Sequence, residues 1–405
     1  MKEVILDTLG QVHSGLSSLI DTPPEGYVFL TNTHLAPRKL RRRIEFSEFR
    51  WVVDGIIPLN LALPFLQSAV PRKHLSADVL FSYNHVSFLS IPWVLQVEFA
   101  HSLVGRGLRA FERFKRFVAA RLSSKDCRSI IVWTENARES LQINFENYDD
   151  WSYKIALIPQ AVPSHQPKKK EDDGIVDFLF VGSINDPRTF YSKGGIETLE
   201  AFLALERRVD RVRLTVRAKV PEFVKARYAL DSRKNIAVID SPVSSNELED
   251  IFLGADIFLY PTHEAQNFVV LDAMSYGLPV VTTQIGASGR VANGDNGFVL
   301  HALPPLFGFR AQRARGYHLP YEAIPISQII RERYDESAVL KGIQSYKNQV
   351  VDEIIETSLK LIDNPKLRLT VGEKGRALVM TGVHSVEERN RKLKSILDNA
   401  TAGTG

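Results

Sequence analysis

Two carboxylates stand eight positions apart within residues 260–279. An apolar run ends at Tyr260, a polar turn follows, and a helix is predicted to begin near Gln266. Glu264 lies in the turn and Asp272 lies inside the helix. Backbone N–H groups at a helix start bind anions such as a diphosphate, and carboxylates accept hydrogen bonds from hydroxyls. The stretch therefore predicts a site for a phosphorylated ligand that carries sugar or ribose hydroxyls.

Motifs of several other chemistries are missing from the sequence. There is no G-x-G-x-x-G after a strand, no P-loop, no H-E-x-x-H, no G-x-S-x-G and no Asp-x-Asp. Hydride transfer, P-loop phosphoryl transfer, zinc hydrolysis and elbow-type esterase chemistry all lose support. The single cysteine, Cys127, excludes a disulfide framework and a thiolate zinc site, and it favours a reducing compartment.

The elements that must position the two acids have the pattern of an α/β protein. Short continuous apolar runs alternate with helical patterns such as residues 195–206 and 244–253, which predicts parallel sheets covered on both faces. Ten runs are too many for one compact sheet, so we expect two doubly wound domains. The predicted strands are residues 27–30, 78–81, 93–97, 129–133, 155–158, 176–181, 212–216, 236–239, 256–260 and 278–282.

A polar linker predicts where the two domains meet. Residues 164–174 contain three consecutive lysines and three consecutive acids with almost nothing apolar, which is typical of a solvated hinge. We therefore predict an N-terminal domain over 1–163, a C-terminal domain over 164–380, and a final helix over 381–405 that packs back on the first domain. Residues 303–349 have weak periodicity and are interpreted as an insertion or long loop.

The carboxylate-bearing stretch resembles the signature of retaining glycosyltransferases of the GT-B fold, specifically the nucleotide-sugar-dependent family 4. That signature has two acids separated by seven residues, then Ala, a short gap and Gly-x-Pro-Val-Val. Here it runs from Glu264 through Asp272-Ala to Gly277-Leu-Pro279-Val-Val. Further pieces that resemble the family are Phe180-Val-Gly182, Lys193-Gly194-Gly195, Ala255-Asp-Ile-Phe-Leu-Tyr-Pro261, Asn296-Gly297, Thr134-Glu-Asn-Ala and Ile158-Pro-Gln-Ala-Val-Pro163.

The resemblance implies two Rossmann-like domains facing a central cleft, and a role for each matching residue. Glu264 would bind donor sugar hydroxyls, Asp272 would bind the ribose, and Lys193 would neutralise the diphosphate. The nucleotide sugar is a substrate, so no cofactor and no metal are expected. The remaining donor contacts are expected from Gly182, Ser183 and the backbone amides of Gln266, Asn267 and Phe268.

Two residues of the predicted donor site differ from the family pattern. The second acid is Asp272 instead of Glu, one C–C bond of about 1.5 Å shorter. Ser183 stands where the family usually has Arg, so one diphosphate cation is missing. We predict that Arg217 or Lys219, just after the strand predicted over 212–216, replaces it, although an ordinary surface arginine is the alternative.

The predicted N-terminal domain is expected to bind the acceptor. The family often carries a His near the sugar at the end of a strand in this domain, and here Glu98 follows the strand predicted over 93–97. We interpret Glu98 as the cleft residue that takes part in catalysis. His85 and His101 are nearby alternatives, and a purely structural role for all three residues stays open.

Charge and hydropathy leave the surroundings of the protein open. The net charge is +4, and the longest apolar stretch, residues 55–66, is too short to cross a bilayer. Five cations lie within residues 38–43, and Leu108, Phe111, Phe114, Val118 and Leu122 form an apolar stripe beside several arginines. The stripe predicts either a core-packed helix with a charged outer face or docking to anionic lipid. Nucleic-acid binding has no supporting motif.

These observations together predict a retaining glycosyltransferase that moves a sugar from a UDP- or GDP-sugar to an acceptor hydroxyl. The acceptor is a glycan, a lipid or a small molecule, and the expected location is the cytoplasm or the inner face of a membrane. The alternative from another class is a non-catalytic GT-B-like binding protein, in which Ser183 and Asp272 mark a degenerate donor site. A phosphorylase or epimerase that shares the fold is a third possibility.

Overall fold

The chain forms two compact units in a computed structural model. The structure describes residues 1–9, 14–31, 58–68, 77–104, 108–163, 165, 173–184, 187, 189–263, 268–287, 290–300 and 336–402. Of these, unit 1 contains residues 1–161 and 386–402, and unit 2 contains residues 162–300 and 336–385. The last described residues of the chain therefore belong to the same unit as its first residues.

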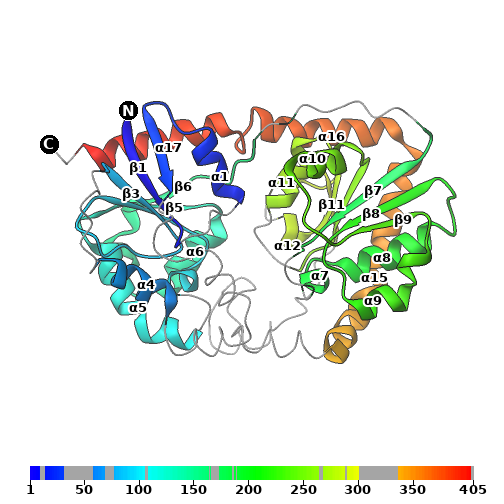
Figure 1. Cartoon of the computed structure of the whole chain (residues 1–405), viewed down its shortest axis with the longest axis horizontal. Coiled ribbons are helices and arrows are strands. Elements are labelled where there is room, and N and C mark those ends of the chain that lie inside the picture. The colour runs from blue at the N-terminus through cyan, green and yellow to red at the C-terminus, as the bar shows by residue number, and fades with distance from the viewer. Residues whose placement is uncertain are drawn as a thin grey trace. The chain divides into compact units, whose positions relative to one another are not determined.

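Unit 1 is built on a sheet whose described strands are all parallel, in the order β2-β1-β3-β4-β5-β6 (Figure 1). Apolar strand residues are buried because helices cover both faces of the sheet, and in β4 all five side chains are buried. The strands are β1 (Lys2–Asp7), β2 (Tyr27–Thr31), β3 (Val79–Tyr83), β4 (Trp93–Val97), β5 (Cys127–Val132) and β6 (Ile155–Leu157). The helices are α1 (Ser14–Asp21), α4 (Leu59–Ser68), α5 (Leu108–Ser123), α6 (Glu135–Asn144) and α17 (Val386–Thr401), with 3₁₀ turns at Ala100–Leu103, Tyr148–Asp150 and Ser152–Lys154.

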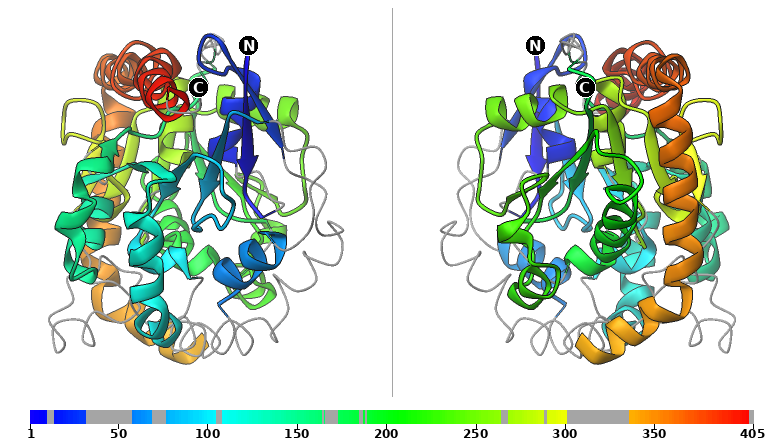
Figure 2. Two further views of the ribbon diagram at one scale, coloured as in Figure 1. Left: turned by 90° about the vertical axis from the view of Figure 1, so that its left-hand side faces the viewer. Right: turned by 90° about the vertical axis from the view of Figure 1, so that its right-hand side faces the viewer.

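Unit 2 repeats the architecture with strand order β12-β11-β10-β7-β8-β9. Helix α15 packs against α8 and the β12 edge, along one flank of the unit (Figure 2). The strands are β7 (Val176–Val181), β8 (Val212–Arg217), β9 (Ile236–Ile239), β10 (Ile257–Tyr260), β11 (Val280–Thr283) and β12 (Phe298–Leu300). The helices are α7 (Thr189–Ser192), α8 (Gly195–Leu205), α9 (Glu222–Tyr228), α10 (Ser245–Leu253), α11 (Phe268–Ser275), α12 (Gln284–Ala287), α15 (Glu336–Asp363) and α16 (Pro365–Met380), with a 3₁₀ turn at Leu230–Ser232.

The two doubly wound parallel sheets predicted from the sequence are confirmed. Strands β1 and β12 are additional to the predicted ones. The segment 303–349 is corrected in part, because residues from 336 onward form the start of the long helix α15 and not a loop. Good helix formers such as Ala338, Leu340 and Lys341 favour a helix there without a periodic apolar face. Residues 301–335 lie outside the described residues.

The apolar stripe predicted on α5 belongs to the core of unit 1. Phe111, Val118 and Leu122 are fully buried in the cluster that surrounds β4 and β5. The core-packed interpretation of the stripe is therefore the correct one, and the stripe itself is not available to lipid. Within the described residues, no helix is both long and apolar enough to cross a bilayer.

Helix α17 is held on unit 1 by polar contacts at both of its ends. Near its start, the Arg389 guanidinium donates to the Ser18 hydroxyl, to the Ser18 carbonyl at 3.1 Å and to the Thr22 carbonyl at 2.9 Å. Near its end, Tyr27 Oη donates to Asp398 at 2.7 Å and Lys2 Nζ donates to Thr401 at 2.7 Å. The C-terminal end of a helix favours a cation, and Arg389 adds charged donors there beside those that Thr22 and Asn390 already supply.

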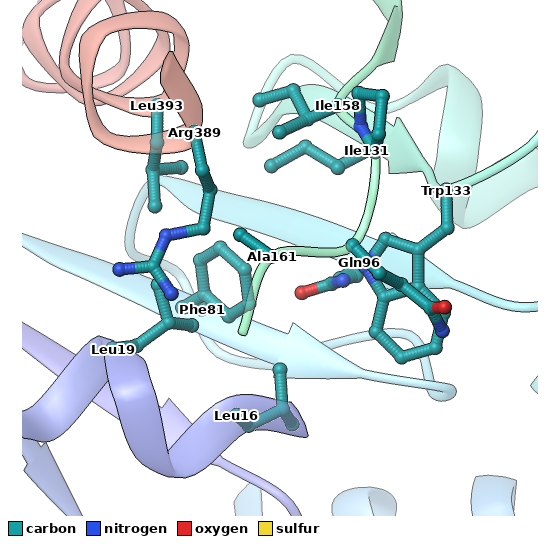
Figure 3. Close-up of a pocket in the computed structure, with 12 residues that line it drawn as sticks. Leu16, Leu19, Phe81, Gln96, Ile131, Trp133, Ile158, Ala161, Arg389 and Leu393 are labelled. Atoms are coloured by element: carbon teal, nitrogen blue, oxygen red, sulfur yellow. The ribbon is translucent and has the colours of Figure 1, made fainter. Parts of the chain in front are cut away.

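A small cavity lies beside this contact, where Arg389 and Leu393 of α17 face Leu16 and Leu19 of α1 (Figure 3). Its space suffices for about one water molecule, so it is a packing gap and not a sugar site. Burial lowers the pKa of the Arg389 guanidinium to about 10, because charge in an apolar environment is costly. The hydrogen bonds to the α1 carbonyls are what make burial of this cation tolerable.

Replacing Arg389 with alanine should destabilise unit 1 by about 2–3 kcal/mol, because it removes the charged donor of three hydrogen bonds that join α17 to Ser18 and Thr22. The measurement is the shift of the urea unfolding midpoint. Arg391→Ala is the matched control on the same helix, because the exposed Arg391 contacts Glu388 only at the surface. Equal midpoints for the two variants would show that the buried contact does not hold α17 in place.

Candidate functional site

In unit 2 the chain adds β8 and β9 on one side of β7 and then β10, β11 and β12 on the other side, so the topological switch point lies between β7 and β10. Strand β7 pairs with β8 on one side and with β10 on the other. Ligands of open α/β sheets bind outside the carboxyl ends of the strands at such a switch point. The segments that leave β7 and β10 contain the predicted residues Gly182, Ser183 and, directly after residues 261–263, Glu264.

The turn that carries Lys193 is packed directly against the exit of β10. Gly194 has a φ of 84°, and a Cβ there would lie 2.2 Å from the Pro261 carbonyl oxygen, so only glycine fits. The Ser192 carbonyl accepts a 2.8 Å hydrogen bond from the His263 backbone N–H. Lys193 Nζ lies 5.8 Å from the centroid of the Tyr260 ring, within the range of a cation–π contact. The predicted phosphate cation therefore lies over the end of β10, at the start of helix α8.

Arg217 ends β8 beside the exit of β7. Its Nη1 donates to the Gly182 carbonyl at 3.4 Å, and its own carbonyl accepts from the Gly182 N–H at 2.9 Å. The side chain is half-buried, its Nε has no hydrogen-bond partner within the described residues, and burial lowers the pKa of the guanidinium. The structure thus places a desolvated cation next to Gly182 and Ser183, where the sequence lacks the expected arginine.

Asp272 lies in α11, the helix that follows β10 after the segment 264–267. Burial raises the pKa of its carboxyl group to about 7, because the charged form is poorly solvated there. Phe268 is buried as the first residue of α11. The backbone and side chains of Glu264, Gln266 and Asn267 lie outside the described residues. Within the part of the chain that the structure describes, no three His, Cys, Asp or Glu side chains gather as a potential metal site.

A buried imidazole–carboxylate pair that we did not predict from the sequence crosses the switch point. His263 Nε2 lies 2.8 Å from Glu197 Oε1, and the two residues are only 4% and 1% exposed. Glu197 belongs to the first turn of α8, and His263 follows β10. One signal for this pair exists in the sequence, since Glu197 is an acid among the apolar residues Ile196 and Leu199 of a buried helix.

In unit 1, Glu98 follows β4 and is oriented by the neighbouring strand. Tyr83 donates its hydroxyl to Glu98 Oε1 at 2.5 Å, and the Glu98 backbone N–H donates to the Asn84 side chain at 2.9 Å. Asn84 has a φ of 57°, a left-handed conformation that asparagine tolerates. The half-buried Glu98 carboxylate is therefore held at the carboxyl edge of this sheet.

The two histidine alternatives occupy different places. His85 is fully buried, donates from Nδ1 to the Tyr83 carbonyl at 2.8 Å, and has Nε2 3.4 Å from the buried Asp7 carboxylate. Asp7 ends β1, so this pair lies at the β1–β3 switch point of unit 1. His101 belongs to a 3₁₀ turn and stacks on Phe99 at 5.9 Å. Glu98 and His85 therefore share one edge of the sheet, and Asp7 is a residue that the sequence did not suggest.

Residues 176–305 match the family model described as Glycosyl transferases group 1. This match covers the strands β7 to β12 and all the segments at the switch point of unit 2. Among curated proteins, none matches the chain in sequence.

Several solved glycosyltransferase structures have a similar fold. WaaG, a glycosyltransferase involved in lipopolysaccharide biosynthesis, superposes with a TM-score of 0.57 over the full length of both chains at 15% identity. HepE of Anabaena in complex with UDP-glucose gives a TM-score of 0.56 at 13% identity, over 98% of this chain and 99% of HepE. TarM gives 0.51 at 13% identity, over 79% of this chain and 54% of TarM, so this chain spans about half the length of TarM.

The sequence motifs, the two sheets and these comparisons agree on the architecture. Identities of this size show a shared fold and not a shared substrate. This chain therefore has the GT-B fold, and residues 176–305 of its second unit are similar to the Glycosyl transferases group 1 family.

Proposed function

We propose that this protein transfers a sugar from a nucleotide-diphosphate donor, a UDP- or GDP-sugar, to an acceptor hydroxyl with retention of configuration. The observation that carries the proposal is that Lys193, before α8, lies over Tyr260 at the end of β10, while Arg217 contacts Gly182 at the exit of the neighbouring β7. Two cations and a helix N-terminus suit a diphosphate. HepE, which shares the fold, has been crystallised with UDP-glucose.

The chemistry assigned to this site is stabilisation of the leaving nucleotide. Negative charge grows on the diphosphate as the bond to the sugar breaks, so fixed cations accelerate the step most when they are shielded from water. Arg217 meets this condition, because it is already partly desolvated. With Lys193 and Arg217 supplying positive charge, no metal is required in this proposal. Glu264 and Asp272 are assigned to the sugar and ribose hydroxyls.

We assign the acceptor to unit 1, on the edge that holds Glu98. Its carboxylate is half-buried and fixed by Tyr83, so it can orient a hydroxyl of a glycan, a lipid-linked sugar or a small molecule. The alternative, a non-catalytic protein with this fold, would bind a nucleotide without turning it over. Measurement of turnover and of binding separates the two.

The proposed membrane location rests on a surface of unit 1 that is separate from the donor site. Phe65 of α4, Phe88 and Phe117 of α5 form a continuous aromatic row, with ring centroids 5.6 and 5.5 Å apart. Phe65 is 58% exposed and Phe117 is 45% exposed, and the exposed Arg113 and Arg116 lie on the same helix as Phe117. Exposed rings beside arginines suit an anionic lipid surface, such as the inner face of a membrane. The basic run at 38–43 lies outside the described residues.

Incubation of the purified chain with UDP-, GDP- and ADP-sugars should release the nucleotide diphosphate from one donor, with or without a chelator. Glu264→Ala and Lys193→Ala should each lower the rate by about 10²–10³-fold, because each removes an interaction with the reacting donor. Lys374→Ala is the control, since Lys374 pairs with Asp295 on the surface. Rates close to wild type in both site variants would contradict the proposal, and nucleotide binding without release would favour the non-catalytic protein.

Arg217→Ala should weaken UDP binding by about tenfold or more, because hydrogen bonds to charged groups contribute about 1.5–3 kcal/mol. Titration calorimetry with UDP measures this change. Arg213→Ala is the matched control on the same strand, because the exposed Arg213 pairs with Asp173 and Asp177 instead. An unchanged affinity in Arg217→Ala would remove this residue from the donor site.

Vesicles that contain anionic lipid should sediment the protein, whereas purely zwitterionic vesicles should sediment much less of it. Phe65→Ser combined with Phe117→Ser should lower the partition coefficient at least about tenfold, because burial of one Phe side chain contributes about 1.5–3 kcal/mol. Phe223→Ser is the control, since Phe223 is also 45% exposed but belongs to α9 of unit 2. Equal sedimentation of the double variant and the control would exclude this surface.

A further inference from the structure

The Glu197–His263 pair has no role in the function proposed above, and its surroundings are unusual for a structural contact. Both side chains are buried, and only one atom of each takes part in the 2.8 Å hydrogen bond between them. Within the described residues, Glu197 Oε2 and His263 Nδ1 have no hydrogen-bond partner. Two apolar side chains of similar volume often stabilise a core as well as or better than such a pair. Core stability alone therefore explains the pair poorly.

The pair connects two segments that already meet through their backbones. The Ser192 carbonyl accepts from the His263 N–H at 2.8 Å and from the Thr262 hydroxyl at 3.3 Å. The close approach of Gly194 to Pro261 brings the same segments together. These backbone contacts fix the turn before α8, and the side-chain pair adds a contact to the first turn of α8 itself.

Lys193 lies in the chain between Ser192, whose carbonyl makes the backbone contact, and Glu197 of the side-chain pair. Lys193 immediately precedes Gly194, which lies three positions before Glu197. Its ammonium group lies over the ring of Tyr260, which lies three positions before His263. A hydrogen bond at 2.8 Å has a defined length and direction, whereas apolar packing tolerates small shifts. The pair thus adds to the backbone contacts a directional link between the first turn of α8, which follows Lys193, and the exit of β10.

We propose that Glu197 and His263 are positioning residues for donor cleavage, which hold Lys193 in register with the exit of β10. This inference rests on the proposed function, because it acts through Lys193. Binding of the nucleotide tolerates a small displacement of this cation, whereas stabilisation of the departing diphosphate does not. A misplacement of about 1 Å by a change away from the reacting atoms is enough to lower a rate about 10²-fold.

The decisive variant combines Glu197→Leu with His263→Leu, which replaces the polar pair with an apolar one. It should keep the thermal midpoint near that of wild type, and its UDP affinity should stay within about threefold. Its kcat on the donor identified above should fall about 10- to 100-fold. If the pair only stabilises the core, kcat should stay unchanged in this variant, whatever the change in thermal midpoint.

If the double variant fails to fold, the kcat values of two single variants test the same inference. In His263→Gln, the amide nitrogen occupies the position of imidazole Nε2 and can still donate to Glu197, so kcat should stay within about threefold of wild type. In His263→Asn, the amide is too short to reach Glu197, so kcat should fall at least tenfold. His384→Gln is the control for loss of a buried histidine elsewhere in unit 2 and should leave kcat unchanged.

The possible outcomes are distinct. An active wild type with kcat preserved in the double variant, or equal in His263→Gln and His263→Asn, overturns the positioning role and leaves the proposed function intact. A wild type that releases no nucleotide diphosphate from any donor overturns the proposed function and this inference with it. A loss of kcat at preserved UDP affinity and thermal midpoint establishes the role.

Discussion

The close approach of Gly194 to Pro261 is the constraint on which the candidate site of unit 2 depends. A Cβ at position 194 would lie 2.2 Å from the Pro261 carbonyl oxygen, and the positive φ of 84° also excludes most other residues. Because the chain before α8 meets the exit of β10 there, Lys193 is placed over the Tyr260 ring. The assignment of Lys193 therefore depends on that backbone contact, together with the parallel order of the strands.

Both sheets use the same kind of contact at their switch points. In unit 1 the carboxylate of Asp7 and the imidazole of His85 extend from β1 and β3, and in unit 2 Glu197 and His263 join the segments after β7 and β10. At each switch point the connections that leave the two adjacent strands run to opposite sides, so no helix joins one of these strands to the other. A polar pair restores a link across that gap, with a direction that apolar packing does not impose.

Patterns within short stretches of sequence predicted the features that depend on neighbouring residues. Continuous apolar runs identified most strands, and the helical pattern over 244–253 predicted α10, whose start has a capping box of Ser244 and Glu247. Strand β12 was missed, and so was β1, in which Lys2 and Glu3 hide a short apolar run. The motif placed Lys193 and Gly182, but the Glu197–His263 pair joins residues 66 positions apart. Only the packing of α8 against β10 brings them together, and no spacing in the sequence encodes it.

Arg217 and Asp272 are both held in surroundings that disfavour their charged forms. Burial lowers the pKa of the Arg217 guanidinium and raises that of the Asp272 carboxyl to about 7, so each charge is disfavoured by its surroundings. The unfolded chain ionises Asp272 from about pH 4 upward, so this group makes unfolding easier as the pH rises from about 4 to 7. A molecule with a diphosphate for the cation and hydroxyl donors for the carboxylate relieves both costs at once. Holding these two groups partly desolvated costs stability, and the proposed function accounts for that cost, because electrostatic catalysis requires groups that are preorganised for the donor.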